Sequence, residues 1–195
     1  MSEPKSKPSF AARMGRPLLA AAAATVSVAA PSAALADIFL NLDGIKGESQ
    51  DQKFKGQIDL LSYTQSFRNS GSVTTGGGGG AGRVTCGAVT VLKNIDAASP
   101  HLIEFVATGK HIPTGVLSFR SASGKDTNAP YYTVTLNDIL VSSIDQTDNP
   151  DPGKIVEKVT LSAAKFRFEY RPQNADGSLG AAVDFGFDCR TNTKF

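Results

Sequence analysis

Hydrophobic and polar residues alternate along most of the chain after residue 36. Alternation with a period of two is typical of β-strands that bury one face and expose the other. Clusters of Gly, Pro, Asp and Asn separate the alternating stretches and are typical of turns. We therefore expect a mainly β, antiparallel fold. The pattern predicts strands over residues 37–42, 57–67, 83–92, 117–120, 131–144, 155–171 and 183–191.

The two longest predicted strands change phase midway. Val159 and Leu161 share one face, whereas Phe166 and Phe168 are one residue out of step with them, and the strand 131–144 contains a similar slip. A β-bulge produces such a slip and bends the strand. Bent, long strands allow a sheet to curl into a barrel, although a β-sandwich also tolerates them.

One helix is expected to interrupt the strands. Ser99 is a favourable N-cap, and Pro100 fits the first helical position. Leu102 and Phe105 belong to an apolar stripe with helical spacing. Gly109 is placed to end the helix in a left-handed conformation.

Residues 1–36 have the pattern of a secretory signal peptide. Basic residues come first, an apolar, alanine-rich run over residues 17–30 follows, and Ala34-Leu35-Ala36 has the small-x-small form of a cleavage site. An alanine-rich helix or a disordered tail is the alternative. The run is too short for a membrane span of about 20 residues, and no stable membrane insertion is expected.

If this signal is used, the mature chain starts at Asp37 and is secreted to the periplasm or the medium. Residues 37–195 contain no internal repeat and no domain boundary. We therefore expect them to form one antiparallel β domain, a barrel or a sandwich, and about 150–160 residues suffice for a substantial core.

The charge balance argues against a nucleic-acid partner. The whole chain has 20 basic and 18 acidic residues, but four of the basic and one of the acidic residues lie in the first 36. The remainder therefore carries a formal charge of −1. A protein that neutralises phosphates needs a basic surplus in its folded part.

Cys86 and Cys189 both lie in alternating runs whose apolar positions face the core. In an exported protein two cysteines can form a disulfide, and whether these two meet depends on the order of the strands. Two buried thiols that behave as small hydrophobic groups are the alternative.

No set of residues assembles a catalytic or metal site. The glycine run lacks the Lys and the following helix of a phosphate-binding loop. His101 begins a stretch that resembles a zinc-protease motif, but Phe105 stands where the second His is required. Neither His101 nor His111 lies near a cysteine in sequence. We expect no enzyme activity, no metal and no cofactor.

The predicted strand 57–67 has small hydroxyl residues on one side, namely Ser62, Thr64 and Ser66. Ile58 and Leu60 begin that same side, so the expected face is only partly polar. Such a face lines a cavity or an interface, or it is an ordinary solvent face.

Several segments in order resemble the Hcp family, the tube proteins of type VI secretion systems. The resemblance covers essentially all of residues 37–195. The segments are Asp37-Ile38-Phe39-Leu40 with the loop 43–49, Ile58-Asp59-Leu60-Leu61-Ser62-Tyr63 with the loop 76–83, Lys93-Asn94-Ile95-Asp96 before the helix, and Leu136-Asn137-Asp138-Ile139 with Tyr170-Arg171-Pro172-Gln173.

The resemblance implies a β-barrel of two sheets with a flanking helix. It also implies rings of six copies that stack into a tube, inside a sheath and behind a spike protein, and that carry small effectors in the lumen. On this hypothesis Ser62, Thr64 and Ser66 line the lumen. The loops that contain Gly76, Gly80, Asp148 and Asp151 are candidates for contacts between copies or between rings.

Residues 1–36 depart from the family pattern, because its members generally begin almost directly at the first strand. Two alternatives follow. The chain is an exported relative that acts as a binding module and builds no tube, or the true start lies downstream of Met1.

Overall fold

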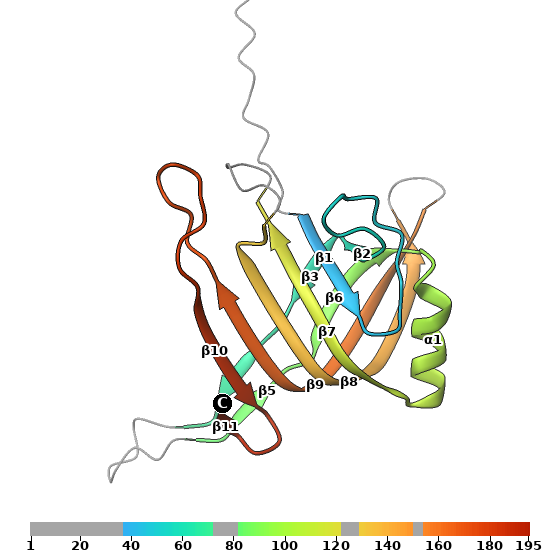
Figure 1. Ribbon diagram of the computed structural model, residues 1–195. Helices are drawn as coiled ribbons and strands as arrows, with labels where there is room; N and C mark the ends of the chain where they lie inside the picture. The colour runs from blue at the N-terminus through green and yellow to red at the C-terminus, as the bar shows by residue number, and fades with distance from the viewer. Residues whose placement is uncertain (1–36, 72–81, 122–128, 150–153) are drawn as a thin grey trace, which may run out of the picture. The chain divides into compact units, whose positions relative to one another are not determined.

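Strands make up most of the chain that the structure describes, and a helix flanks them (Figure 1). The computed structural model describes residues 37–71, 82–121, 129–149 and 154–195. The predicted mainly β class is confirmed. In chain order the elements are β1 Asp37–Leu42, β2 Ile58–Leu60, β3 Ser62–Thr64, β4 Phe67–Asn69, β5 Val84–Cys86, β6 Val89–Asn94, α1 Ser99–Thr108, β7 His111–Arg120, β8 Tyr132–Asp148, β9 Ile155–Tyr170, β10 Val183–Asp188 and β11 Thr193–Lys194.

The main sheet has nine strands and is antiparallel throughout. Its order is β11-β10-β9-β8-β7-β1-β2, and β6 joins β3 on one side to β9 on the other. β2 and β3 are consecutive segments of chain, separated by Leu61, and carry the pairing from β1 to β6. The sheet therefore curls back on itself without forming one uninterrupted ladder. β4 and β5 form a second, two-stranded sheet.

The core lies inside this curled sheet. Alternate residues of β1, β6, β7, β8 and β9 point into it, because successive side chains of a strand point to opposite faces. Each such side chain contributes about 1.5–3 kcal/mol when it is fully removed from water. The largest apolar side chains that are almost completely buried are Leu40, Leu42, Ile58, Leu102, Ile112, Leu117, Leu136, Ile139, Leu161 and Phe166.

The predicted phase change in the long strands occurs at Asp138. Leu136 is buried before this position and Ile139 after it, so the inward face moves by one residue. The pairing register with β9 does not change there. Asp138 has a φ of 54° instead. A left-handed backbone conformation therefore turns the strand at this level, where we expected a bulge.

A β-bulge does occur, but four residues further on. The register with β9 shifts between Val141 and Ser143, which pair with Leu161 and Thr160. Ser142 is thus the additional residue of β8. Because bulges bend strands and strengthen their twist, Ser142 helps the long β8–β9 pair to curl.

The structure divides one predicted strand into β2, β3 and β4. Ile58 and Leu60 are buried, whereas Ser62 and Thr64 are exposed. The chain bends at Leu61, whose side chain is 51% exposed. We predicted that one face of the strand carries Ile58, Leu60, Ser62 and Thr64, and this is wrong. β2 pairs with β1 and β3 pairs with β6, and the face that points into the core changes between them.

The predicted helix is α1, and it ends as expected. Gly109 has a φ of 65°, and its N–H donates a hydrogen bond to Phe105 O at 3.0 Å. The start is one residue earlier than expected, with Ala98 as the N-cap. The Ser99 hydroxyl accepts a hydrogen bond from the N–H of Asp96 at 3.1 Å and takes part in a buried network described below.

Candidate functional site

Small hydroxyl residues from four strands form one continuous row on the outside of the sheet. Thr64 of β3 pairs with Thr90 of β6, Thr90 pairs with Thr160 of β9, and Thr160 pairs with Ser143 of β8. Ser62 lies two residues before Thr64 on the same face of β3. We call Ser62, Thr64, Thr90, Ser143 and Thr160 the hydroxyl face.

Local sequence explains why these side chains point away from the core. Val89 and Val91 are buried, so the intervening Thr90 faces outward. Val159 and Leu161 are buried in the same way on either side of Thr160. The alternation of apolar and hydroxyl residues thus gives each of the four strands one outward-facing hydroxyl at the point where the row crosses it.

The hydroxyl face is polar and nearly uncharged. Ser143 Oγ donates a hydrogen bond to Thr160 Oγ1 at 3.0 Å. The adjacent row contains Lys158 and Asp145, which form an ion pair at 3.2 Å and neutralise each other. A hydroxyl both donates and accepts hydrogen bonds, so this surface can contact polar groups of either kind without a strong preference for one sign of charge.

The structure brings together only some of the residues singled out from the sequence. Ser62 and Thr64 lie on the hydroxyl face, but Ser66 lies beyond β3, where its carbonyl accepts a hydrogen bond from Gly87 N at 2.7 Å. Thr90, Thr160 and Ser143 were missed. Their alternation with buried valines was visible in the sequence, but the pairing that aligns them was not.

The proposed contact loops are mostly beyond what can be described. Gly76, Gly80 and Asp151 lie outside the described residues. Asp148, expected in the loop after residue 144, is the last residue of β8 and pairs with Ile155. The predicted loop placement of Asp148 is wrong, because β8 and β9 continue their ladder further than the turn-forming residues suggested.

A disulfide links the second sheet to the end of β10. The structure joins Cys86 in β5 to Cys189, with the two Cα atoms 6.1 Å apart at a sequence separation of 103. We call β4 and β5 the arm. The ring of Phe67 in β4 packs edge-on against Phe166 and Phe168 of β9, at centroid distances of 5.2 and 5.5 Å.

A buried ionic network fixes the start of α1 to the sheet. Lys93 Nζ lies 2.8 Å from Glu157 Oε2 and 2.8 Å from Asp96 Oδ1. The Ser99 hydroxyl donates to Glu157 Oε2 at 2.6 Å, and Gln146 Nε2 donates to Glu157 Oε1 at 2.6 Å. Lys93 is 1% exposed and Glu157 is fully buried.

Glu157 remains charged in this network. Burial by itself raises the pKa of Glu157. Hydrogen bonds from Lys93, Ser99 and Gln146, together with the charge of Lys93, outweigh this effect and hold the pKa below its usual value. The carboxylate therefore serves as a structural anion, since all of its oxygens have partners.

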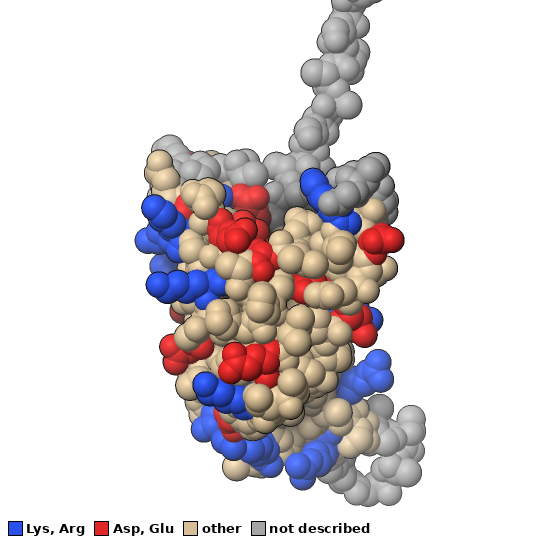
Figure 2. Space-filling model, turned by 90° about the vertical axis from the view of Figure 1, so that its right-hand side faces the viewer, with Lys and Arg blue, Asp and Glu red and all other residues tan. Residues whose placement is uncertain are grey.

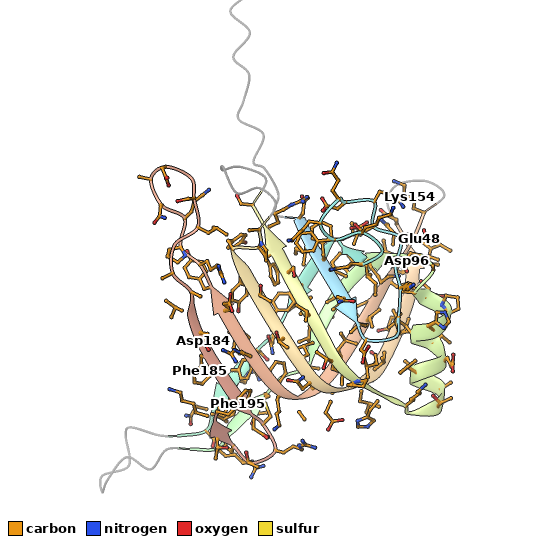
Figure 3. The ribbon with its side chains drawn as sticks, in the orientation of Figure 1. Glu48, Asp96, Lys154, Asp184, Phe185 and Phe195 are labelled. Carbon is orange, nitrogen blue, oxygen red and sulfur yellow. A yellow bond between two sulfur atoms is a disulfide. The ribbon has the colours of Figure 1, made fainter. Side chains whose placement is uncertain are left out.

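Exposed apolar side chains lie on several elements, among them β10 and α1. Val183 and Phe185 on β10 are 69% and 46% exposed, and Tyr170 of β9 pairs with Val183. Figure 3 labels Phe185 on β10, at the side of the picture opposite to α1. Ile103 and Val106 are exposed on α1. Figure 2 shows the side that carries α1, where uncharged surface extends between separate groups of charged residues.

Two other kinds of site are absent from the described part of the chain. In residues 37–71, 82–121, 129–149 and 154–195, no group of three or more His, Cys, Asp or Glu side chains is placed to hold a metal ion. Within these same ranges no helix has the length and apolar character needed to cross a membrane.

Comparisons with known proteins agree with one another. Residues 39–170 match the family model described as "Type VI secretion system effector, Hcp". The chain is 36% identical to Protein hcp1 of Pseudomonas aeruginosa over 159 residues, which is 81% of this chain and 98% of that protein.

Two solved structures show the same fold. Hcp1 from Salmonella typhimurium is 31% identical and has a TM-score of 0.69, over 83% of this chain and 99% of that one. A structure described as a type six secretion system protein has a TM-score of 0.77 at 24% identity, over 82% of this chain and 99% of that one.

Proposed function

Because the chain belongs to the Hcp family of type VI secretion proteins, we propose that it is a structural tube component that assembles into rings of six copies. The family match over residues 39–170 carries this proposal, since it spans most of the strands and the helix. The family is structural and secreted. On this proposal the protein works through association with copies of itself, and with a sheath and a spike protein, without catalysis.

Exposed apolar side chains on β10 and on α1 support a ring. A closed ring needs two different, complementary surfaces on each copy, one on either flank. We assign these two roles to Val183 and Phe185 on β10 and to Ile103 and Val106 on α1, because all four are exposed and β10 and α1 lie on opposite sides of Figure 1. Burial of exposed apolar surface stabilises association by about 25 cal/mol per Å² before the costs of binding are subtracted.

The hydroxyl face is proposed to line the lumen. A channel wall of hydroxyls, with the Lys158–Asp145 pair neutral beside them, holds polar passengers through hydrogen bonds and releases them again. Its mixed donor and acceptor character suits small secreted effectors of varied sequence. Thr90, Thr160 and Ser143 thereby join Ser62 and Thr64 as lumen residues.

Electron microscopy of the purified protein, with native mass spectrometry, tests the ring. We expect hollow rings of six copies, with the hydroxyl face on the channel side in a reconstructed map. A protein that stays monomeric or dimeric at high concentration contradicts the proposal.

A pair of variants tests the lumen separately. Thr64→Arg combined with Thr160→Arg places large charged groups on the hydroxyl face and should impair retention of a small effector from the same secretion system while rings persist. Asn41→Arg, at an exposed position of β1, is the matched control and should leave both unchanged. Undiminished effector binding by the double variant contradicts the lumen assignment.

A second candidate function rests on the signal-like pattern of residues 1–36, which lie outside the described residues. On that proposal the protein is exported separately to the periplasm or medium and acts as a binding module that builds no tube. N-terminal sequencing of the secreted protein distinguishes the two. A start at Asp37 together with a monomer favours the binding module, whereas retention of residues 1–36 in six-copy rings rules it out.

A further inference from the structure

The arm is attached to the rest of the molecule at few points. β4 and β5 pair with each other, and in the described part of the chain neither pairs with a strand of the main sheet. The hydrogen bonds Gly87 N to Ser66 O and Ser70 N to Arg83 O also stay within this hairpin. The arm therefore lacks the ladder that holds every strand of the main sheet.

Among the described residues, three kinds of contact hold the arm against β9 and against the hairpin of β10 and β11. Phe67 packs on two phenylalanines of β9, Val84 N donates to Asn192 Oδ1 at 2.9 Å, and the disulfide joins Cys86 to Cys189. Of these, only the disulfide is covalent, and Phe67 remains 39% exposed in its contact. The disulfide is therefore the dominant attachment.

The main sheet, unlike the arm, does not depend on the Cys86–Cys189 disulfide for its attachment. β9 keeps β8 on one edge, with β6 and β10 on the other, through continuous antiparallel ladders. Cys86 and Cys189 are both only partly buried and pack at the border of the core. Opening the disulfide should consequently release the arm while the core stays packed.

We propose that the Cys86–Cys189 disulfide is a redox latch that holds the arm on the barrel in an oxidising compartment and releases it in a reducing one. A dithiol opens the latch. The Sγ–Sγ bond breaks, two electrons and two protons convert the cysteines to thiols, and the dithiol becomes a disulfide. The proposal rests on the proposed function only in that a secreted tube protein passes from a reducing cytosol to an oxidising exterior.

Limited trypsin digestion of the full-length protein tests the latch. Arg68 in β4 and Arg83 beside β5 are exposed cleavage sites on the arm, and Lys110 after α1 is an exposed reference site outside it. Cleavage of a native protein follows the population of the locally open form. Dithiothreitol should raise the cleavage rate at Arg68 and Arg83 by about tenfold or more and leave Lys110 within about twofold.

Variants separate the disulfide from the aromatic contact. Cys86→Ser with Cys189→Ser should be cleaved like the reduced wild type without any reductant. Phe67→Ala, with the disulfide intact, should remain resistant when oxidised. If the double variant does not fold, reduction of the wild type alone decides the matter.

Several results overturn the latch. The first is an oxidised protein with two alkylatable thiols, and the second is an unchanged cleavage rate at Arg68 and Arg83 after reduction. The third is an equal rise in the cleavage rate at Lys110, which would show that the whole fold loosens. The fourth is rapid cleavage of the oxidised Phe67→Ala variant at Arg68 and Arg83, which would show that aromatic packing holds the arm. Electron microscopy tests ring formation in a separate experiment, so a result that contradicts the redox latch does not contradict the proposed function.

Discussion

Replacing Glu157 by Gln should destabilise the fold far more than an equivalent change at the surface. The amide keeps the size of the side chain but removes the charge that faces Lys93. Lys93 Nζ, which lies 2.8 Å from Glu157 Oε2, would then be a cation at 1% exposure with only Asp96 as a charged partner.

The magnitude follows from what Lys93 retains. Removal of one partner from a buried ion pair typically costs about 3–5 kcal/mol, because the remaining charge is left uncompensated in a poorly solvated place. Here Asp96 Oδ1 stays 2.8 Å from Lys93 Nζ, and Ser99 still has an amide oxygen to donate to. We therefore expect a loss of about 2–3 kcal/mol in the free energy of unfolding for Glu157→Gln.

The loss should depend on pH in a defined direction. Because the pKa of Glu157 is lowered in the folded state, its charge contributes stability above the ordinary carboxyl pKa of about 4.3. That contribution disappears as the pH falls through the lower, folded pKa. The difference between wild type and Glu157→Gln should therefore be constant between about pH 6 and 8 and shrink below about pH 4.3.

Urea unfolding at one fixed protein concentration measures these differences, since any ring assembly stabilises the fold by mass action. Asp145→Asn is the matched control, because it removes the acid of the exposed Lys158 pair and should cost less than about 1 kcal/mol. If Glu157→Gln costs no more than Asp145→Asn, or if its effect is independent of pH down to acid, the reasoning about the buried network is refuted.

Two further predictions concern residues of the main sheet. Gly115→Val should lower the melting temperature and reduce the free energy of unfolding by about 1–3 kcal/mol. A Cβ at this position would lie 2.7 Å from Ile139 Cδ1 and 2.8 Å from Leu42 Cδ2, and both of these side chains are buried. An unchanged melting temperature would contradict this prediction. His111→Ala should raise the pKa of Asp138, which is held low first by its hydrogen bond with His111. NMR titration of the carboxyl measures this, and an unchanged pKa would exclude that cause.

Sequence patterns identified most of the elements, but they misjudged how some of them end. The alternation located β1, β8 and β9, because successive side chains of a strand point to opposite faces whatever the strand pairs with. Asp148 was placed in a loop by its turn-forming neighbours, yet cross-strand pairing with Ile155 keeps it in β8. Leu61 separates two strands that read as one, because β2 and β3 pair with different partners.

The candidate site was predicted in part for the same reason. Ser62 and Thr64 were recognised from alternation along a single strand. Thr90, Thr160 and Ser143 complete the hydroxyl face only because four strands meet in one register. Ser66 was included by periodicity but lies past the end of β3.

From the sequence alone follow the mainly β class, the flanking helix with its glycine end, and the family, because these depend on local periodicity, on backbone preferences of single residues and on ordered motifs. Only the tertiary structure decided that Cys86 meets Cys189 and that Lys93 meets Glu157, and it alone showed the turn of the strand at Asp138. The two pairings join residues far apart in the chain and depend on strand order and register, which short-range patterns do not encode.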